Sequence, residues 1–267
     1  MIAPSIDTRL LKKIIIDVAK KELMPRFANV THTAKADKSI VTEADIATQK
    51  SIIEQLQQHW PEIQLLGEEM STEEQVQIFN NNQAMWCLDP LDGTSNFAAG
   101  IPYFAISLAL LFEAKVILAV VYDPTRDELF FAEDNNGKIT VSLNDKALSL
   151  AKSQRNLETA VALVDLKRLS KDMASRIATE QPFASQRNFG ASALDWCWLA
   201  TSRSHIYLHG NQNIWDYAAG ELILRGAGGL SQTLNGEPVF KAELEKRSVV
   251  AAVDKELFNE WTTWLNN

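Results

Sequence analysis

The sequence predicts a mixed α+β fold, and two observations carry that prediction. Residues 104–143 contain four strand-like segments separated by short turns, which is typical of an antiparallel meander. Beyond residue 153, helical and strand-like segments alternate. With 267 residues, 46% of them hydrophobic, the chain can bury a sizeable core. We therefore expect an α+β half over residues 1–147 and an α/β half over residues 148–267.

The N-terminal segment predicts two helices. Apolar residues between 6 and 26 recur at helical spacing with lysines between them, and Pro25 marks the end of that helix. A polar link follows, and Thr42 with Glu43 could cap a second helix running to about residue 59. Asp45 falls in the first turn of this helix. An acid there can simply interact favourably with the helix dipole, or it can have a functional role.

A short strand over residues 63–66 runs into Gly67-Glu68-Glu69. Adjacent glutamates are usually exposed to solvent. A pair placed directly after a strand end can equally be part of a functional site. Ser71 and Glu74 have the spacing of a capping box, which predicts a short surface helix after the glutamates.

The most informative stretch is residues 85–97. Four apolar residues that predict a buried strand run into Asp89-Pro90-Leu91-Asp92-Gly93. The proline stiffens the turn, and the glycine permits a close backbone approach to a ligand. Residues 94–96 are N-cap types, so a short helix could start there with its free N–H groups near an anion. Carboxylates in this layout favour a hard cation, although Asp-Pro and Asp-Gly pairs also form ordinary turns.

The meander is expected as strands 104–112, 115–122, 128–132 and 139–143. In the C-terminal half we expect strands 161–164, 206–209 and 249–253 and helices 166–179, 192–201, 217–226 and 255–265. Asp216 stands at the entrance to one of these helices, where it could be a plain N-cap or a ligand.

Charge and cysteine content narrow the classes of function. The net charge is −8 and no basic run is present, which argues against nucleic-acid or anionic-membrane binding. Cys87 and Cys197 lie beside tryptophans in apolar runs and are expected to be reduced core residues. The longest apolar run is too short to cross a bilayer, and no signal peptide is evident, so a cytoplasmic location is expected.

Five motifs in fixed order resemble the inositol monophosphatase family of magnesium-dependent, lithium-sensitive phosphatases. They are VTEAD at 41–45, GEE at 67–69, DPLDGTSNF at 89–97, a glycine-serine turn at 190–192 and WDYAAG at 215–220. The resemblance implies a layered αβαβα sandwich of the type that fructose-1,6-bisphosphatases share. Related bisphosphate nucleotidases carry the same motifs, so the resemblance specifies chemistry better than substrate.

The resemblance also implies roles for individual residues. Glu68, Asp89 and the carbonyl of Leu91 would bind one magnesium; Asp89, Asp92 and Asp216 would bind a second; and Glu68 could contact a third. These are oxygen donors, as a hard cation prefers.

The remaining implied roles concern water and substrate. Thr94, hydrogen-bonded to Asp45, would position and activate the attacking water together with Glu68. Backbone N–H groups of Gly93 and Thr94 would hold the phosphate. The residues expected to contact the rest of the substrate are Asp92, Ser192, His209 and Asp216. Lys35 and Glu69 would contact the metal ligands rather than the metal itself.

Two departures from the family pattern concern the substrate. His209 takes the position of a glutamate that contacts inositol hydroxyls in the family, and a neutral imidazole cannot replace a carboxylate as a hydroxyl acceptor. Ala98-Ala99 also replaces polar residues found in many members. Both changes weaken the expectation that inositol monophosphate is the substrate.

The expected function is magnesium-dependent hydrolysis of a small phosphate monoester, nominally inositol monophosphate, by a homodimer. One alternative is another sugar phosphate or adenosine 3′,5′-bisphosphate as substrate. A second alternative, from another class, is a protein-binding partner of the transcription machinery. The complete set of acids argues against a purely non-catalytic protein.

Overall fold

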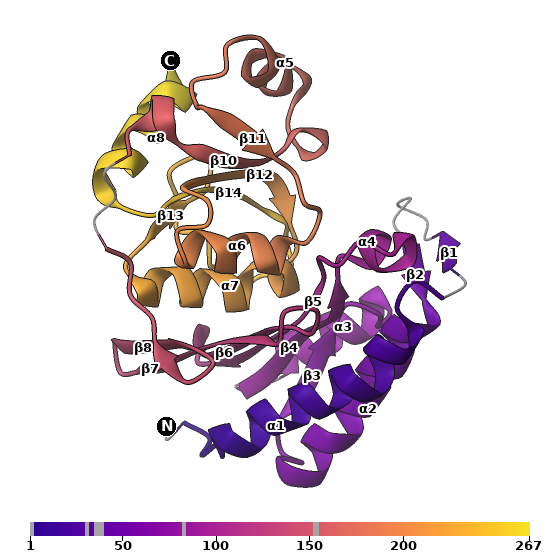
Figure 1. The fold of residues 1–267 in the computed structure, drawn as a ribbon. Helices are drawn as coiled ribbons and strands as arrows, with labels where there is room; N and C mark the ends of the chain where they lie inside the picture. Colours follow the sequence, from indigo (N-terminus) through magenta and orange to yellow (C-terminus); the bar gives the residue numbers. More distant parts are fainter. Residues whose placement is uncertain (1–2, 30–31, 35–39, 82–83, 152–154) are drawn as a thin grey trace.

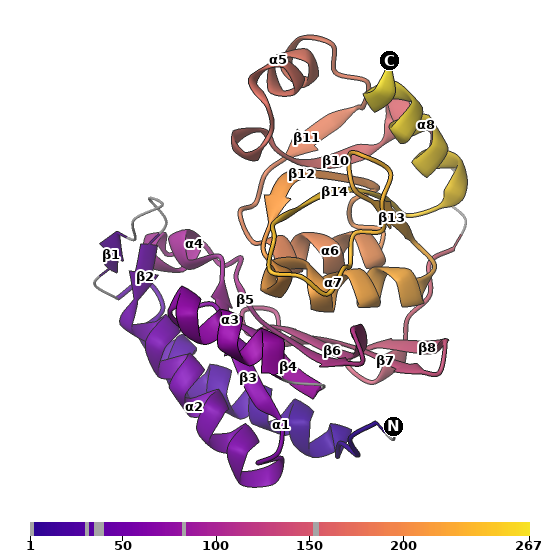
Figure 2. The same ribbon diagram turned by 180° about the vertical axis from the view of Figure 1, so that it is seen from behind.

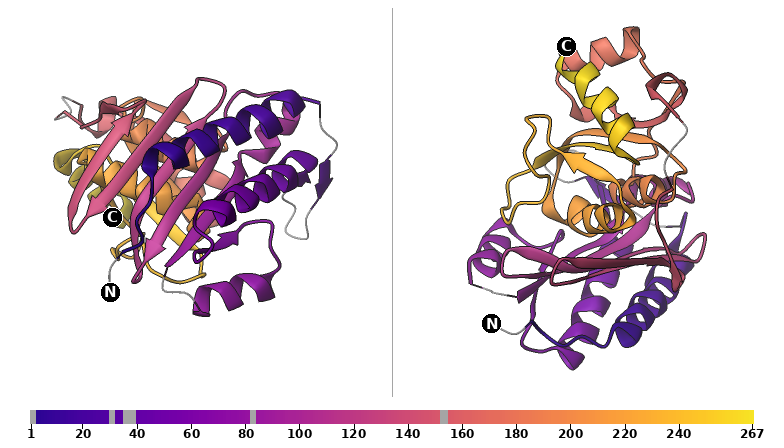
Figure 3. Two further views of the ribbon diagram at one scale, coloured as in Figure 1. Left: turned by 90° about the horizontal axis from the view of Figure 1, so that it is seen from below. Right: turned by 90° about the vertical axis from the view of Figure 1, so that its left-hand side faces the viewer.

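The computed structural model describes residues 3–29, 32–34, 40–81, 84–151 and 155–267. Figure 1 and the right-hand view of Figure 3 show alternating layers of helices and sheets. From one side to the other they are α5 with α8, a five-stranded sheet, α6 with α7, a seven-stranded sheet, and α1 with α2. The αβαβα sandwich implied by the resemblance is therefore the observed fold.

The seven-stranded sheet has the order β3-β4-β5-β6-β7-β8-β9 and is antiparallel except for the pair β3 and β4. The predicted meander is confirmed. The strands are β3 Gln64–Gly67, β4 Ala84–Asp92, β5 Ala105–Phe112, β6 Lys115–Asp123, β7 Glu128–Asn135, β8 Lys138–Leu143 and β9 Lys146–Ala147. Between Asp89 and Asp92 the pairing of β4 with β5 shifts register. Pro90 lies inside this irregularity, where its missing N–H costs the ladder no regular hydrogen bond.

Two long helices cover the outer face of this sheet, as seen from below in the left-hand view of Figure 3. They are α1 (Thr8–Val18), continued by a π-helical turn η1 (Ala19–Leu23) and a 3₁₀ turn η2 (Met24–Arg26), and α2 (Glu43–His59). Thr42 is the N-cap of α2 as predicted, but its capping-box partner is Asp45 rather than Glu43. The Ser71–Glu74 capping box is also confirmed, and it starts α3 (Thr72–Asn81) beside β3.

The five-stranded sheet has the order β11-β10-β12-β14-β13. Its strands are β10 Val161–Asp165, β11 Ser185–Arg187, β12 Ile206–Gln212, β13 Leu230–Gln232 and β14 Arg247–Ala252. β10 runs parallel to β11 and β12, whereas β14 is antiparallel to β12 and β13. The sequence did not predict β11 and β13, because three-residue strands carry no periodicity of their own.

The helices of the C-terminal half are α5 (Lys171–Thr179), α6 (Ser192–Ala200), α7 (Ile214–Ala227) and α8 (Lys255–Asn266). The single helix predicted over 166–179 is wrong, because Ser170 caps α5 and separates it from a 3₁₀ turn η4 (Leu166–Arg168). α7 starts three residues earlier than predicted, since Asn213 provides its N-cap. Figure 2 shows α6 and α7 between the two sheets.

A single hydrophobic cluster joins the two halves. It includes Cys87 and Ala109 from the seven-stranded sheet, Trp196 and Leu222 from the helices between the sheets, and Val250 from the five-stranded sheet. A second cluster lies under α1 and α2. Both cysteines are buried and free, as predicted. None of the helices in the described part of the chain combines the length and hydrophobicity that a membrane crossing needs.

Candidate active site

The four acids predicted as metal ligands come from three separate segments of the sequence and line one cavity of about 180 Å³. They come from three places in the fold: Glu68 directly follows β3, Asp89 and Asp92 lie at the end of β4, and Asp216 lies in the first turn of α7. Leu91, Gly93, Thr94 and Ser192 line the same cavity. The structure thus brings together the predicted ligands of the N-terminal half and the predicted ligand of the C-terminal half.

The end of β4 is held by hydrogen bonds within its own turn. The backbone N–H of Leu91 donates to Asp89 Oδ1 at 3.0 Å, and Thr94 Oγ1 lies 3.1 Å from the carbonyl oxygen of Leu91. Gly93 has a φ of +92°, and a Cβ there would lie 2.9 Å from the carbonyl oxygen of Tyr103, so only glycine fits. The predicted short helix is α4 (Thr94–Ala99), but its N-cap is Gly93 rather than one of the hydroxyl or amide residues.

Glu68 is anchored to the same strand, since its N–H donates to the carbonyl of Leu88 at 3.1 Å. The preceding Gly67 packs against Gln49 so closely that a Cβ would lie 2.3 Å from Gln49 Oε1. That oxygen accepts the N–H of Glu69 at 3.2 Å. Glu69 is not among the described residues that line the cavity, so the two adjacent glutamates have different surroundings.

Thr94 and Asp45 form the predicted pair, with Thr94 Oγ1 3.0 Å from Asp45 Oδ1. The other oxygen of Asp45 accepts the N–H and the hydroxyl of Thr42 at 2.7 and 2.6 Å. Asp45 therefore caps α2 and contacts Thr94 at once, so the structural interpretation of this acid is confirmed and its functional role stays a prediction. Burial raises the pKa of Asp45, while the hydrogen bonds from Thr42 and Thr94 oppose that rise.

Asp92 and Asp216 also have structural partners. Asp92 Oδ2 accepts the N–H of Ala193 at 2.6 Å, which places this carboxylate at the N-terminus of α6. Asp216 is the third residue of α7, and its Oδ2 accepts the N–H of Asn213 at 2.8 Å. The plain N-cap interpretation of Asp216 is wrong, because Asn213 is the cap.

Burial and neighbouring carboxylates raise the pKa values of three aspartates in the cavity. Burial raises the pKa of Asp89 and of Asp92 well above the ordinary aspartate value, and neighbouring carboxylates raise both further. The pKa of Asp216 rises to about 7, through burial first and the charge of Glu68 second. Buried like charges of this kind need a positive partner, which identifies the cavity as a candidate functional site.

The donor set fits a magnesium-type cation. Four carboxylates and the Leu91 carbonyl are all oxygen donors, whereas the described cavity lining contains one histidine and no cysteine. Within the described residues, no three histidine, cysteine, aspartate or glutamate side chains already form a ligand cluster, so the fit rests on donor chemistry. Lys35, the predicted supporting lysine, lies outside the described residues.

His209 lines the cavity, and both of its ring nitrogens lie near other polar groups. His209 Nδ1 accepts the N–H of Asn211 at 3.1 Å, and Nε2 lies 3.6 Å from Asp165 Oδ2. Asp165 lines the cavity too. Asp165, on the neighbouring strand, therefore places a carboxylate beside the histidine that takes the position of the family's glutamate.

Sequence reasoning missed several other residues of the cavity. Asp165 ends a strand that is parallel to the strand of His209, and functional side chains often gather at such strand ends, so a signal was available. Asp195 lies one helical turn after Ser192, but nothing in the sequence distinguished it from a core residue. The missed lining residues are Asp165, Arg168, Asn188, Asp195, Asn211, Asn213 and Lys246.

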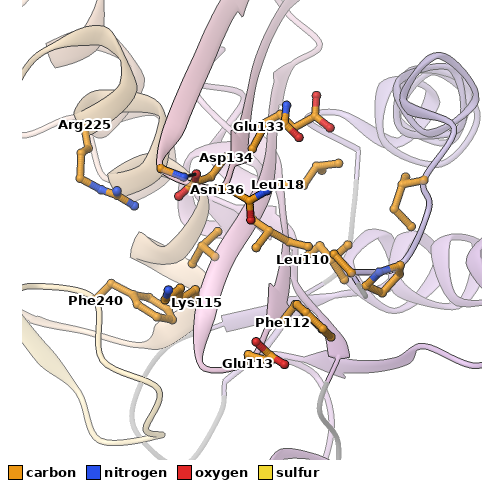
Figure 4. Close-up of a pocket in the computed structure, with 17 residues that line it drawn as sticks. Leu110, Phe112, Glu113, Lys115, Leu118, Glu133, Asp134, Asn136, Arg225 and Phe240 are labelled. Carbon is orange, nitrogen blue, oxygen red and sulfur yellow. Dashed lines mark hydrogen bonds between the residues drawn. The ribbon is translucent and has the colours of Figure 1, made fainter. Parts of the chain in front are cut away.

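A larger cavity of about 650 Å³ lies elsewhere, at the hairpin of β5 and β6 (Figure 4). Figure 4 shows side chains such as Phe112, Lys115, Asn136, Arg225 and Phe240 around it. None of the predicted site residues lines this cavity. Size therefore does not identify the site, and the concentration of buried acids does.

The comparison with known proteins agrees with this geometry. The sequence profile of the Inositol monophosphatase family matches residues 5–263. The chain belongs to the inositol monophosphatase family. The resemblance inferred from five motifs is thus confirmed over nearly the whole chain.

Individual members of the family carry different names. The chain is 31% identical over 233 residues to the Nus factor SuhB of Pasteurella multocida, covering 85% of this chain and 84% of that protein. It is 33% identical over 233 residues to the inositol-1-monophosphatase of Caulobacter vibrioides, covering 83% and 88%. The crystal structure of an IMPase/NADP phosphatase complexed with Mg²⁺ and phosphate matches with a TM-score of 0.81 at 25% identity, covering 97% and 93%.

Proposed function

We propose that this protein is a magnesium-dependent phosphatase of small phosphate monoesters. The observation that carries the proposal is the meeting of Glu68, Asp89, Asp92 and Asp216 in one cavity, beside the hydrogen-bonded pair of Thr94 and Asp45. Two relatives support it: one is named an inositol-1-monophosphatase, and another was crystallised with Mg²⁺ and phosphate.

The acids of the cavity have a specific task in this proposal. Glu68, Asp89 and the Leu91 carbonyl would hold one magnesium, and Asp89, Asp92 and Asp216 would hold another. When bound, magnesium would neutralise these closely spaced carboxylates and stabilise the negative charge on the phosphoryl oxygens. Asp92 is already aimed by the Ala193 N–H, and Asp216 by the Asn213 N–H, so the protein fixes two of these ligands independently of a substrate.

Thr94 and Asp45 would prepare the attacking water. Thr94 has one hydroxyl proton and two acceptors within reach, Asp45 Oδ1 and the Leu91 carbonyl. Donation to Asp45 leaves the oxygen lone pairs of Thr94 free to accept a hydrogen bond from water, and Glu68 lines the same cavity as a second acceptor. Backbone N–H groups of Gly93 and Thr94, at the start of α4, would hold the phosphate. General-base assistance of this kind contributes about 10²–10⁴-fold to rate.

Phosphate release by the purified protein tests the proposal. The substrates are inositol 1-phosphate, adenosine 3′,5′-bisphosphate and p-nitrophenyl phosphate, each assayed with magnesium, with EDTA and with added lithium. We expect turnover that needs magnesium, is inhibited by lithium and falls by about a hundredfold or more in Asp92→Asn. The matched control is Asp172→Asn, which changes an exposed acid in the first turn of α5 and should leave turnover unchanged. Magnesium-independent turnover, or full activity of Asp92→Asn, would refute the mechanism.

A second candidate is a protein-binding role in the transcription machinery, favoured by the 31% identity to a protein named Nus factor SuhB. The same Asp92→Asn variant separates the two candidates in cells. If catalysis carries the function, the variant behaves like a deletion. If protein binding carries it, the variant behaves like the unaltered protein.

A further inference from the structure

Two neighbouring parallel strands, β10 and β12, contribute side chains to the cavity. In the register of β10 with β12, Asp165 pairs directly with His209. Both residues line the cavity that contains Asp89, Asp92 and Asp216. The backbone therefore places an acid and a histidine side by side, next to the acids that would hold the metals.

The hydrogen bond that His209 accepts determines which ring nitrogen carries the hydrogen. The ring is buried, and burial lowers its pKa to about 4, so the imidazole is neutral near pH 7. Nδ1 accepts the Asn211 N–H, so the single ring hydrogen is on Nε2, the nitrogen that lies 3.6 Å from Asp165 Oδ2. The lone pair of the ring is already occupied, so His209 is poorly suited to accept a hydroxyl from a substrate.

Asp165 has acceptor capacity left. Its Oδ1 accepts the Lys167 N–H at 3.0 Å, and its Oδ2 lies near His209. A carboxylate has about four lone-pair positions, so the cavity side of Asp165 can still accept hydrogen bonds. The side chain is 20% exposed, which leaves it open to a ligand while its strand holds it.

The 3₁₀ turn η4, which follows Asp165, is in close contact with β12, the strand of His209. A Cβ on Gly210 would lie 1.8 Å from the carbonyl oxygen of Arg168, so β12 and η4 touch backbone to backbone. This contact fixes the position of Asp165 relative to His209.

The rest of this wall is polar. Among the described lining residues none is phenylalanine, tyrosine or tryptophan. The amides and cations that line the same cavity are Arg168, Asn188, Asn211, Asn213 and Lys246. Such a surface suits a leaving group rich in hydroxyls.

We propose that Asp165 accepts hydrogen bonds from hydroxyl groups of the leaving group, and that the neighbouring His209 orients it. This inference rests on the proposed phosphatase function, because it concerns the part of the substrate that leaves. Asp165 is a specificity-determining residue in this assignment, and His209 is a positioning residue.

Two substrates that differ in their hydroxyls test Asp165. Inositol 1-phosphate carries hydroxyls beside the phosphate, and p-nitrophenyl phosphate carries none. In Asp165→Asn we expect kcat/KM for inositol 1-phosphate to fall about tenfold to a hundredfold, mainly through KM, with p-nitrophenyl phosphate changed less than about twofold. Asparagine retains an oxygen for the Lys167 N–H, and Asp172→Asn is the matched surface control. Equal losses on both substrates, or no loss on either, would overturn the assignment.

The positioning role of His209 is tested separately. His209→Leu removes the N–H that faces Asp165, whereas His209→Gln retains an N–H donor at a similar reach. We expect His209→Leu to lower kcat/KM for inositol 1-phosphate, His209→Gln to recover part of the loss, and His209→Leu to add nothing in the Asp165→Asn background. Additive losses in the double variant would show that His209 contacts the substrate itself, and would overturn its positioning role.

Failure of the proposed function can be distinguished from failure of this inference. If the wild type hydrolyses none of the substrates in magnesium, the phosphatase proposal fails. Calorimetric titration with inositol 1-phosphate then tests Asp165 alone. Binding that weakens about tenfold in Asp165→Asn supports the inference, and absent binding or equal affinities overturn it.

Discussion

At the scale of single residues, the side chains to which we assign chemical roles also have structural partners. Asp45 caps a helix and contacts Thr94. Asp92 accepts a backbone N–H in the first turn of α6, and Asp216 accepts the N–H of Asn213. Backbone hydrogen bonds thus orient the acids that the proposed chemistry uses. Side chains held in this way lose little freedom when a ligand arrives, which is the benefit of preorganisation.

Thr94 provides a test on the phosphate side of the cavity. Thr94→Val keeps the shape of the side chain but removes the hydroxyl that contacts Asp45. We expect kcat to fall about 10²–10⁴-fold, and to fall equally on inositol 1-phosphate and p-nitrophenyl phosphate, because the role does not involve the leaving group. Thr94→Ser should retain activity within about tenfold. Steady-state kinetics measure both, and full activity of the valine variant would contradict the role of the hydroxyl.

Asp195 provides a test of pH dependence. It is buried beside Tyr103, whose hydroxyl donates to Asp195 Oδ1 at 3.0 Å, and burial raises its pKa to about 8. A raised acid pKa means that the folded state binds the proton more tightly than the unfolded state. The resulting stability is present below about pH 4 and is lost as the pH rises through 8.

Asp195→Asn should therefore match the wild type in stability near pH 4 and exceed it near pH 8.5, by about 1 to 4 kcal/mol. The asparagine oxygen can still accept the Tyr103 hydroxyl. Urea unfolding of both proteins at the two pH values, in EDTA, measures the difference. A stability difference that does not change with pH would show that Asp195 is ionised in the folded protein.

At the scale of elements, strand ends and helix starts assemble the cavity. β3 runs parallel to β4 and ends opposite Leu88, which brings Glu68 next to the β4 aspartates, while the irregular pairing after Asp89 turns that chain toward α4. On the other side, the pairing of β10 with β12 ends at Asp165 and His209. The start of α7 between these two sheets adds Asp216.

Gly210 tests the contact between β12 and η4. Gly210→Ala would place a methyl group against the Arg168 carbonyl, and backbone atoms cannot move aside as a flexible side chain can. We expect a loss of about 1–3 kcal/mol in unfolding free energy from overpacking. Because η4 follows Asp165, kcat/KM for inositol 1-phosphate should fall more than kcat/KM for p-nitrophenyl phosphate. Thermal unfolding and kinetics measure the two effects, and an unchanged ratio between the substrates would contradict the proposed link.

At the scale of the whole molecule, the site belongs to neither half alone. Glu68, Asp89 and Asp92 precede residue 148 and Asp216 follows it, so the acid set is complete only when the halves are packed together. One hydrophobic cluster spans both halves. We infer that folding and assembly of the site are a single cooperative event.

Magnesium should stabilise this assembly. A ligand that binds only the folded protein adds about 2.7 kcal/mol at a hundred times its Kd, which for a chain of this size corresponds to several degrees in Tm. We expect one unfolding transition, shifted upward by magnesium in the wild type and in Asp172→Asn, and shifted little in Asp92→Asn. Differential scanning calorimetry measures all three. Two separate transitions would show that the halves unfold independently.

The sequence by itself determined the local elements and the identity of the acids. Periodic apolar residues specify which face of a helix or strand is buried, so the meander, α2 and the apolar part of β4 were predictable, and ordered motifs identified Glu68, Asp89, Asp92 and Asp216. Only the tertiary structure decided which side chains meet. The strands β11 and β13, the pairing of Asp165 with His209 and the two roles of Asp45 depend on contacts between segments distant in sequence. No local pattern records such contacts, because strand register and helix packing follow from how all layers fill the core together.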